Sequence, residues 1–200
     1  MSTVEFFWDP ASPYTYLAST QILALAERAG ATVEWKPFLL GKVFEATDNK
    51  APATIPAKGK HLFCDLQRWA AHYAVPVTMP KVFPVHSVLA LRAGVAAGLQ
   101  GRAAAAAYAQ AVMKAYWAEG IDISQPDNVA AAGNAAGLDG AALVAQAQDQ
   151  AVKDALRVNT EEAVKRGAFG APTFFVGAQM FWGNDRLVLL EEYLAGRLAA

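Results

Sequence analysis

The sequence has 200 residues and a single cysteine, Cys64. One cysteine cannot form a disulfide within the chain, so a disulfide oxidoreductase is disfavoured. Free cysteines are among the most buried residue types, and we therefore expect Cys64 to be a reduced, buried thiol. The N-terminus lacks the basic and apolar regions of a secretory signal, since a strand-like segment follows at once. Both features favour a cytoplasmic protein.

Long apolar runs and a strong charge imbalance are also missing. No stretch approaches the roughly 20 apolar residues of a membrane span, because Gly, Gln, Lys and Asp interrupt the alanine-rich segments. The 17 basic and 18 acidic residues give a net charge of −1, with no basic cluster for nucleic acid. We therefore expect neither a membrane nor a nucleic acid as partner. Apolar residues make up 54% of the sequence, which indicates a compact globular protein.

Metal-binding and nucleotide-binding motifs are absent as well. The three histidines, His61, His72 and His86, lack the spacing of metal ligands, and no carboxylate–histidine cluster accompanies them. The sequence contains neither a glycine-rich dinucleotide motif nor a P-loop. We therefore expect no metal site.

The N-terminal end of the sequence carries an α/β pattern. Residues 4–8 form a short apolar run typical of a buried strand, and a helix is expected over residues 14–29, where Gly30 ends it. Residues 32–38 then alternate like a half-buried strand. Two strands joined by a helix of this length predict a parallel βαβ unit.

An α/β pattern returns near the C-terminus. Residues 173–176 and 179–182 are strand-like and flank a glycine-containing turn, which predicts a hairpin. A last helix is expected over residues 187–198, with Asn184 or Asp185 as its cap.

The middle of the chain is predominantly helical in pattern. After a loop-rich stretch with several prolines, residues 41–60, the sequence is rich in alanine, a strong helix former. Helices are expected over residues 61–75, 86–97, 101–118, 126–136 and 140–166.

These elements together predict an α/β fold. Near one end of the chain a strand, a turn and a helix follow one another. Near the other end a small residue and a proline precede a strand. This is the layout of a thioredoxin-like domain. We expect residues 1–40 and 167–200 to form this domain, and residues 41–166 to form a large all-helical insertion.

Ser12 lies at the turn where a thioredoxin-like domain has its active site. Serine followed by proline is a typical helix start, because the hydroxyl caps free N–H groups and proline fits the first helical position. The same hydroxyl, beside the positive end of a helix, could instead stabilise a thiolate. No cysteine lies at this turn, so a sulfur would have to arrive with a ligand. No base lies close in sequence, which disfavours a directly nucleophilic serine.

Two further segments could bind other parts of such a ligand. The pair Ala171-Pro172 precedes a hydrophobic strand, where we expect a cis peptide bond and a backbone at Ala171 that pairs with a peptide-like ligand. Residues 183–186 are either a plain helix cap or a clamp for an amino-acid end. In the clamp, backbone N–H groups hold a carboxylate and Asp185 pairs with an ammonium.

Glutathione has a thiol, a peptide backbone and a free amino-acid end, and so fits all three segments. Asn49, Lys50 and Lys58 in the loop-rich stretch could meet its other carboxylate, although each of them alone is more often part of a plain solvated surface. Aromatic residues that could line a pocket for an aromatic substrate, or simply fill the core, are Trp69, Tyr73 and Phe83.

A family resemblance extends over nearly the whole chain. Its most specific stretches are FFWDPASPYTYLAS, ATDNKAPATIPAKGKHLFCDLQRWA and GAFGAPTFFVGAQMFWGNDRL. In these stretches the chain resembles bacterial 2-hydroxychromene-2-carboxylate isomerases, of the DsbA-like group that includes kappa-class glutathione transferases. The resemblance implies a thioredoxin-like domain with a helical insertion, glutathione as cofactor, a small aromatic substrate and a homodimer.

The resemblance also implies roles for individual residues. Ser12 matches the position that stabilises the glutathione sulfur, and Ala171 matches the backbone contact before the cis-proline, Pro172. His61 stands where the family leads us to expect an aromatic hydroxyl such as tyrosine. Asn184 and Asp185 match the positions that hold the γ-glutamyl end. Asn49 and Lys58 match loop positions at the glutathione or substrate site.

The implied reaction interconverts 2-hydroxychromene-2-carboxylate and trans-o-hydroxybenzylidenepyruvate, a step in naphthalene-type catabolism. Two other functions stay open at this point. One is a kappa-like glutathione transferase that conjugates electrophiles, and the other is a non-catalytic domain that binds glutathione or peptides.

Overall fold

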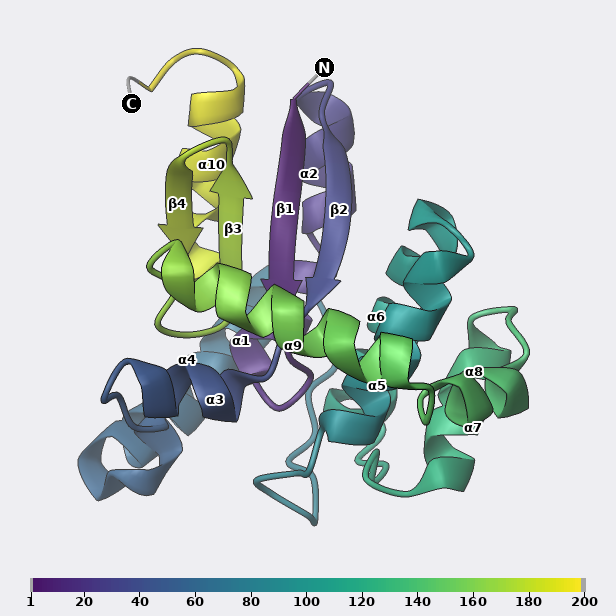
Figure 1. Ribbon diagram of the computed structural model, residues 1–200. Coiled ribbons are helices and arrows are strands. Elements are labelled where there is room, and N and C mark those ends of the chain that lie inside the picture. The colour runs from purple at the N-terminus through teal and green to yellow at the C-terminus, as the bar shows by residue number, and fades with distance from the viewer. Residues whose placement is uncertain (1, 199–200) are drawn as a thin grey trace.

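The computed structural model describes residues 2–198, which fold around a four-stranded mixed sheet (Figure 1). The strands are β1 (Thr3–Trp8), β2 (Thr32–Pro37), β3 (Thr173–Val176) and β4 (Gln179–Trp182), in the spatial order β2-β1-β3-β4. β1 pairs with β2 in parallel, whereas β3 pairs antiparallel with both β1 and β4. The predicted strands, the parallel βαβ unit and the hairpin are confirmed.

The crossover between β1 and β2 contains two helices, and the single helix predicted over residues 14–29 is wrong. The two are α1 (Pro13–Ser19) and α2 (Ile22–Arg28). At the break, the hydroxyls of Ser19 and Thr20 each donate to the carbonyl oxygen three residues earlier. Such local side-chain bonds compete with the helical backbone bonds, and α1 therefore ends early.

The stretch 41–60 is more helical than predicted. It contains most of α3 (Leu40–Ala46) and the short 3₁₀ turn η1 (Pro52–Thr54), and α4 (Pro56–Tyr73) starts within it. Pro56 lies at the first helical position of α4, which proline favours because the N–H it lacks has no helical partner there. A proline that suggested a loop thus begins a helix.

The remaining helices follow the predicted order with two corrections. They are α5 (Val88–Leu99), α6 (Arg102–Trp117), α7 (Pro126–Ala135), α8 (Gly140–Gln146), α9 (Gln150–Lys165) and α10 (Leu187–Leu194), with the 3₁₀ turn η2 (Asn184–Arg186) before the last. The single helix predicted over 140–166 is wrong, because Asp149 has an extended backbone and starts α9 anew. α10 also ends earlier than predicted.

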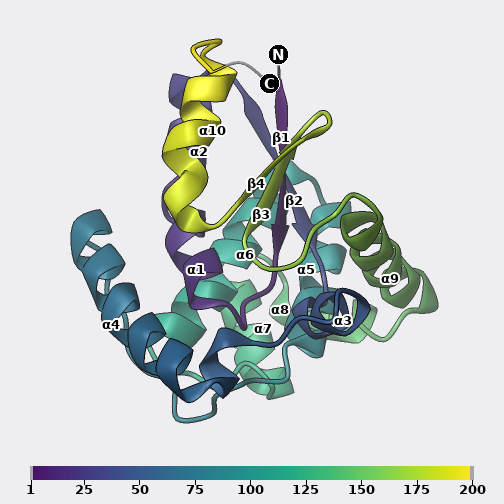
Figure 2. The ribbon, with the colours of Figure 1, turned by 90° about the vertical axis from the view of Figure 1, so that its left-hand side faces the viewer.

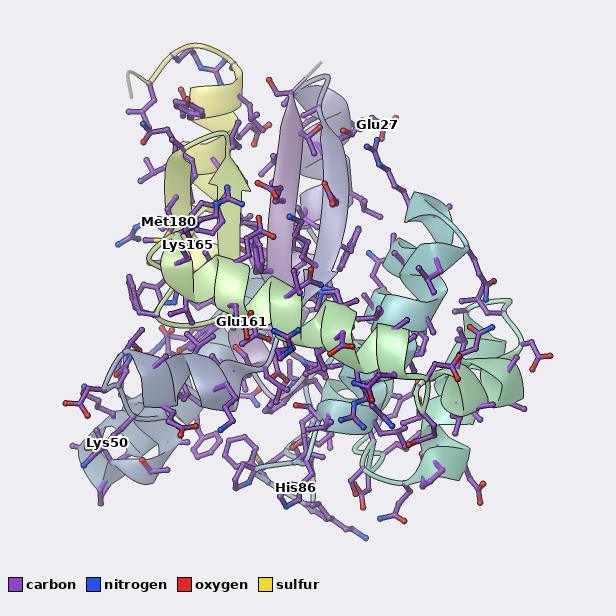
Figure 3. The ribbon with its side chains drawn as sticks, viewed as in Figure 1. Glu27, Lys50, His86, Glu161, Lys165 and Met180 are labelled. Carbon is purple, nitrogen blue, oxygen red and sulfur yellow. The ribbon has the colours of Figure 1, made fainter. Side chains whose placement is uncertain are left out.

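The two faces of the sheet carry different layers (Figure 2). α2 and α10 lie together against one face, and α9 crosses the other. Side chains of β1 alternate between the faces. Phe6 and Trp8 enter the larger buried cluster, whereas Phe7 joins a smaller one with Phe38 and Phe175. Met180 of β4, labelled beside the end of α9 in Figure 3, packs against the smaller cluster.

The larger cluster also draws on the helices between the two α/β segments. Trp8 and Leu17 share it with Tyr108 and Trp117 of α6. One core therefore joins the sheet and the helical segment, and the exact division at residues 40/41 and 166/167 stays a prediction.

Cys64 lies on the outer side of α4, and the prediction of a buried thiol is wrong. It is exposed, because α4 buries Leu62 and Leu66 on a different face. Within residues 2–198, no helix is long and apolar enough to cross a membrane.

Candidate active site

A pocket of about 730 Å³ lies where five segments meet. They are the turn between β1 and α1, the chain from α3 through α4, the loop between α4 and α5, the loop before β3, and the turn before α10. The volume lies within the range of roughly 300–1,000 Å³ that is usual for small-molecule sites. The predicted site residues that line it are Ser12, Asn49, Lys58, Ala171, Asn184 and Asp185. Pro172 lies outside the lining.

Ser12 is buried at the start of α1, and its hydroxyl makes two hydrogen bonds. The oxygen accepts from the backbone N–H of Thr15 at 3.3 Å, which confirms the predicted helix cap. The hydroxyl donates to the carbonyl oxygen of Ala171 at 3.0 Å. Its single hydrogen is therefore used within the protein. A thiolate at this position would have to take that hydrogen bond over from Ala171.

Two buried side chains hold the turn that carries this serine, and sequence reasoning missed both. Asp9 accepts from the backbone N–H groups of Ala11 at 2.9 Å and Leu40 at 3.0 Å. Burial raises the pKa of the Asp9 carboxyl, although these bonds oppose the rise. The indole of Trp117 donates to the carbonyl oxygen of Pro10 at 2.8 Å. In the sequence, the signal for the role of Asp9 is an acidic residue directly after a buried strand.

The Ala171–Pro172 peptide bond is cis, as predicted. The carbonyl oxygen of Pro172 accepts from the N–H of Gly183 at 3.0 Å, which joins the loop before β3 to the turn before α10. The carbonyl of Ala171 meets Ser12. This loop therefore connects two of the three segments that were expected to bind one ligand.

Residues 183–186 do not cap α10 with a side chain, so that expectation is wrong. Asn184 is 3% exposed, and its amide nitrogen has no hydrogen-bond partner among the described residues. A buried donor without an acceptor is costly, at about 1–3 kcal/mol. A ligand oxygen at this point would remove that cost. The carboxylate of Asp185 is exposed and pairs with the adjacent Arg186.

The loop-side residues have different surroundings. The Asn49 amide donates to the carbonyl oxygen of Phe169 at 3.0 Å, and its oxygen accepts from the N–H of Lys50 at 2.8 Å. Asn49 thus holds the segment after α3 against the loop before β3. Lys50 lies at the end of the molecule formed by α3 and α4 (Figure 3). Lys58 is exposed in the first turn of α4 and makes no ion pair within residues 2–198.

Aromatic side chains supply much of the remaining lining. Trp182 packs on Phe169 with ring centroids 4.8 Å apart, and Trp69 and Phe83 line the same pocket. Tyr73 lies outside the lining and donates to the backbone of η2 at 3.3 Å. Of the three aromatic candidates from the sequence, Trp69 and Phe83 are thus lining residues.

Tyr14 of α1 and Asp65 of α4 form a polar pair in the pocket wall that sequence reasoning also missed. The Tyr14 hydroxyl donates to the Asp65 carboxylate at 2.8 Å. Burial, and then the neighbouring carboxylate, raise the pKa of Tyr14. The two residues are 51 positions apart, and no local pattern signalled their contact. His61, one turn before Asp65, lines the pocket too.

The chain matches known proteins over almost its full length. The DSBA-like thioredoxin domain family matches residues 3–195. The 2-hydroxychromene-2-carboxylate isomerase of Sphingobium xenophagum is 36% identical over 96% of this chain and 97% of its own. Glutathione S-transferase kappa 1 of Homo sapiens is 28% identical over 96% of this chain and 90% of its own. A solved selenomethionine 2-hydroxychromene-2-carboxylate isomerase is 32% identical, covers 97% and 95% of the two chains, and has a TM-score of 0.88.

Fold and site together define a thioredoxin-like protein with serine at the active turn. The chain belongs to the DSBA-like thioredoxin domain family and, within it, to the family of the 2-hydroxychromene-2-carboxylate isomerases. The predicted α/β fold, a thioredoxin-like domain with a large helical insertion, is confirmed.

Proposed function

We propose that this protein is a glutathione-dependent isomerase that interconverts 2-hydroxychromene-2-carboxylate and trans-o-hydroxybenzylidenepyruvate in the breakdown of naphthalene-type aromatics. One observation carries the proposal. The Ser12 hydroxyl, the Ala171 backbone and the buried Asn184 amide line a single pocket. They do so in a chain that is 36% identical to a relative named for this activity.

The residues present fit glutathione. Ser12 would meet the sulfur, and the backbone of Ala171, set by the cis bond to Pro172, would pair with the peptide. At the γ-glutamyl end, the amide of Asn184 offers an unused donor and Asp185 offers a carboxylate for the ammonium. At the opposite end, Asn49 and the ammonium of Lys58 lie on the loop side, where they would meet the glycine carboxylate.

Bound glutathione would supply a thiolate that adds reversibly to the double bond conjugated with the substrate ketone, so that the bond becomes single and can rotate. Ser12 would favour that thiolate by donating a hydrogen bond to the charged sulfur. The Ala171 carbonyl would then lose its donor. The exchange would still favour the thiolate, because a hydrogen bond to a charged group is stronger than one between neutral groups. Trp182 and Phe169 offer apolar faces to an aromatic ring. Isomerisation leaves no net redox change, which suits a turn without cysteine.

Kinetics with trans-o-hydroxybenzylidenepyruvate test the reaction. The absorbance of the substrate should move to an equilibrium value only when protein and glutathione are both present, and a thiol assay should find all of the glutathione afterwards. A kappa-like transferase, the alternative that the human relative supports, would consume one thiol for each molecule of substrate. No change in absorbance would leave only a binding domain.

Calorimetry with glutathione tests the cofactor independently of turnover. Asp185→Ala should weaken binding by about 10- to 100-fold, because a hydrogen bond to a charged group contributes about 1.5–3 kcal/mol. Asp154→Ala, which removes a carboxylate of α9 outside this pocket, should bind like the unchanged protein. Equal affinities of the two variants would contradict the assignment of Asp185.

The expected cytoplasmic homodimer also stays a proposal. The homodimer is supported by exposed apolar side chains on the adjacent helices α2 and α10, namely Leu23, Val188 and Leu189. Sedimentation of the purified protein would show whether it is a dimer, and Val188→Glu should then shift it toward the monomer.

A further inference from the structure

The hydroxyl hydrogen of Tyr14 is already used within the protein. It points to Asp65, with 2.8 Å between the two oxygens. An ionised carboxylate can only accept hydrogen bonds, so Tyr14 must be the donor of this pair. Tyr14 lines the pocket, and its hydroxyl oxygen can still accept a hydrogen bond but has no hydrogen left to donate.

The tyrosine keeps this state at neutral pH. Burial raises the pKa of Tyr14, and the carboxylates of Asp65 and Asp185 raise it further, so the hydroxyl stays protonated. The lining of the same pocket includes the apolar side chains of Leu62, Trp69 and Phe83. An acceptor in a pocket with apolar walls favours a ligand that brings a hydrogen-bond donor on an otherwise apolar body.

The chemistry of the proposed substrate places such a donor close to the reacting carbon. In an enone conjugated to an aromatic ring, a thiolate adds at the carbon that bears the ring. A hydroxyl ortho to this side chain is then only a few bonds from the sulfur. Tyr14 follows Ser12 by two residues in the first turn of α1, and both line the pocket.

We propose that Tyr14, oriented by Asp65, accepts a hydrogen bond from the ortho-hydroxyl of the substrate, and that the site therefore selects aromatic enones that carry this hydroxyl. The inference rests on the proposed isomerase function and names its specificity residue. Tyr14 contacts the substrate, whereas Asp65 acts through Tyr14 as a positioning residue.

Binding of unreactive ligands tests the contact without turnover. Suitable probes are 4-(2-hydroxyphenyl)-2-oxobutanoate and its phenyl analogue, which lack the double bond to which a thiol adds. Calorimetry in the presence of glutathione should show the hydroxyl ligand bound about ten-fold more tightly by the unchanged protein, the value of one net hydrogen bond. In Tyr14→Phe the two affinities should become equal. Tyr16→Phe, a control on the same helix outside the lining, should keep the preference.

The role of Asp65 needs a different probe. Asp65→Leu leaves Tyr14 in place and frees its hydrogen, so that Tyr14 could donate to an ether oxygen. The probe is the ortho-methoxy ligand, 4-(2-methoxyphenyl)-2-oxobutanoate. Its affinity relative to that of the ortho-hydroxy ligand should therefore be about ten-fold higher in Asp65→Leu than in the unchanged protein. In Tyr14→Phe the methoxy ligand should not gain affinity over the phenyl ligand, because no hydrogen is available to donate.

These outcomes separate this inference from the proposed function. Retention of the hydroxyl preference in Tyr14→Phe, no preference in the unchanged protein, or no binding of the hydroxyl ligand overturns the contact with Tyr14. An unchanged methoxy-to-hydroxy ratio in Asp65→Leu overturns the role of Asp65. If the enone did not isomerise, the proposed reaction would be wrong. The preference for the hydroxyl ligand over the phenyl ligand would still show whether Tyr14 sets the binding specificity.

Discussion

Ser12 has two partners, and each matters for a different property. Its oxygen caps α1 at the N–H of Thr15, which concerns stability, and its hydrogen goes to Ala171 across the pocket, which concerns the ligand. The cap was readable from the serine and the proline that follows it. The contact with Ala171 joins positions 159 residues apart, and only the folded chain shows it.

Ser12→Ala should lower isomerase activity near neutral pH by about ten-fold. The hydrogen bond to a charged sulfur, about 1.5–3 kcal/mol, exceeds the neutral bond given up at Ala171, about 0.5–1.5 kcal/mol. The pKa of the bound thiol should rise, so part of the activity should return at higher pH, where the thiolate forms unaided. The measurement is the rate of isomerisation across pH with saturating glutathione.

Ser19→Ala is the matched control for this prediction. Ser19 is buried on the same helix and donates to Tyr16 at 2.7 Å, but it does not line the pocket. Ser19→Ala should lower the free energy of unfolding by about 1 kcal/mol, as much as the loss of the Ser12 cap on α1, but it should leave the activity unchanged. Equal activity of Ser12→Ala and the unchanged protein at neutral pH would remove Ser12 from the mechanism.

At the scale of elements, the packing of α5 against the end of β1 depends on a glycine. A Cβ added at Gly94 would lie 2.8 and 2.9 Å from two ring atoms of Trp8. Trp8 is 1% exposed and directly precedes Asp9, which holds the active turn. By packing closely against Trp8, α5 therefore helps to fix the position of Asp9 and of the active turn.

Gly94→Ala should destabilise the fold by about 1–3 kcal/mol, because the buried indole cannot move aside without strain. Gly98 lies one turn further along the same helix, and a Cβ there meets nothing within 4 Å. Gly98→Ala should instead stabilise the helix, by up to about 1 kcal/mol. Denaturant unfolding of both variants provides the measurement, and shifts of the same sign would refute the packing argument.

At the scale of the whole molecule, an ionic network joins the sheet to α9. Lys36 of β2 contacts Glu5 of β1 at 2.6 Å and Glu162 of α9 at 3.0 Å. Arg166, at the end of α9, contacts Glu5 at 2.8 Å and lies over the ring of Phe175 at 3.9 Å. The network connects the N-terminal strands to the helix that leads into β3, so segments far apart in the chain share one set of charges.

The network should make stability depend on acid pH. Burial by itself raises the pKa of Glu5, but hydrogen bonds from Arg166 and Lys36 outweigh it, so that this pKa lies below its ordinary value. The stabilisation is then fully present above the ordinary glutamate pKa of about 4.3 and is lost as the pH falls through the lowered folded value.

Glu5→Gln should lower the free energy of unfolding at pH 7 by about 1–2 kcal/mol, a value reduced for partial exposure. It should also flatten the fall in stability below about pH 4. Glu45→Gln, which removes an exposed pair with Lys42, should change neither quantity measurably. Parallel pH profiles for Glu5→Gln and the unchanged protein would contradict the role of the network.

Local patterns in the sequence encode the strands and most of the helices. Alternating apolar residues and turn glycines specify the strands, and alanine-rich runs specify most helices, because these signals act between near neighbours. Helix breaks at Thr20 and Asp149 were missed, since hydroxyl bonds and a single extended residue overrode a continuous helical pattern.

Which of these elements contact one another follows only from the packing of the folded chain. The exposure of Cys64, the burial of the Asn184 amide, the support of the active turn by Asp9 and the pair of Tyr14 with Asp65 all depend on segments far apart in the chain. Burial and hydrogen-bond partners are set by packing, and packing brings together residues whose separation in sequence leaves no periodic signal. The residue types of the site were therefore readable in advance, and their partners were not.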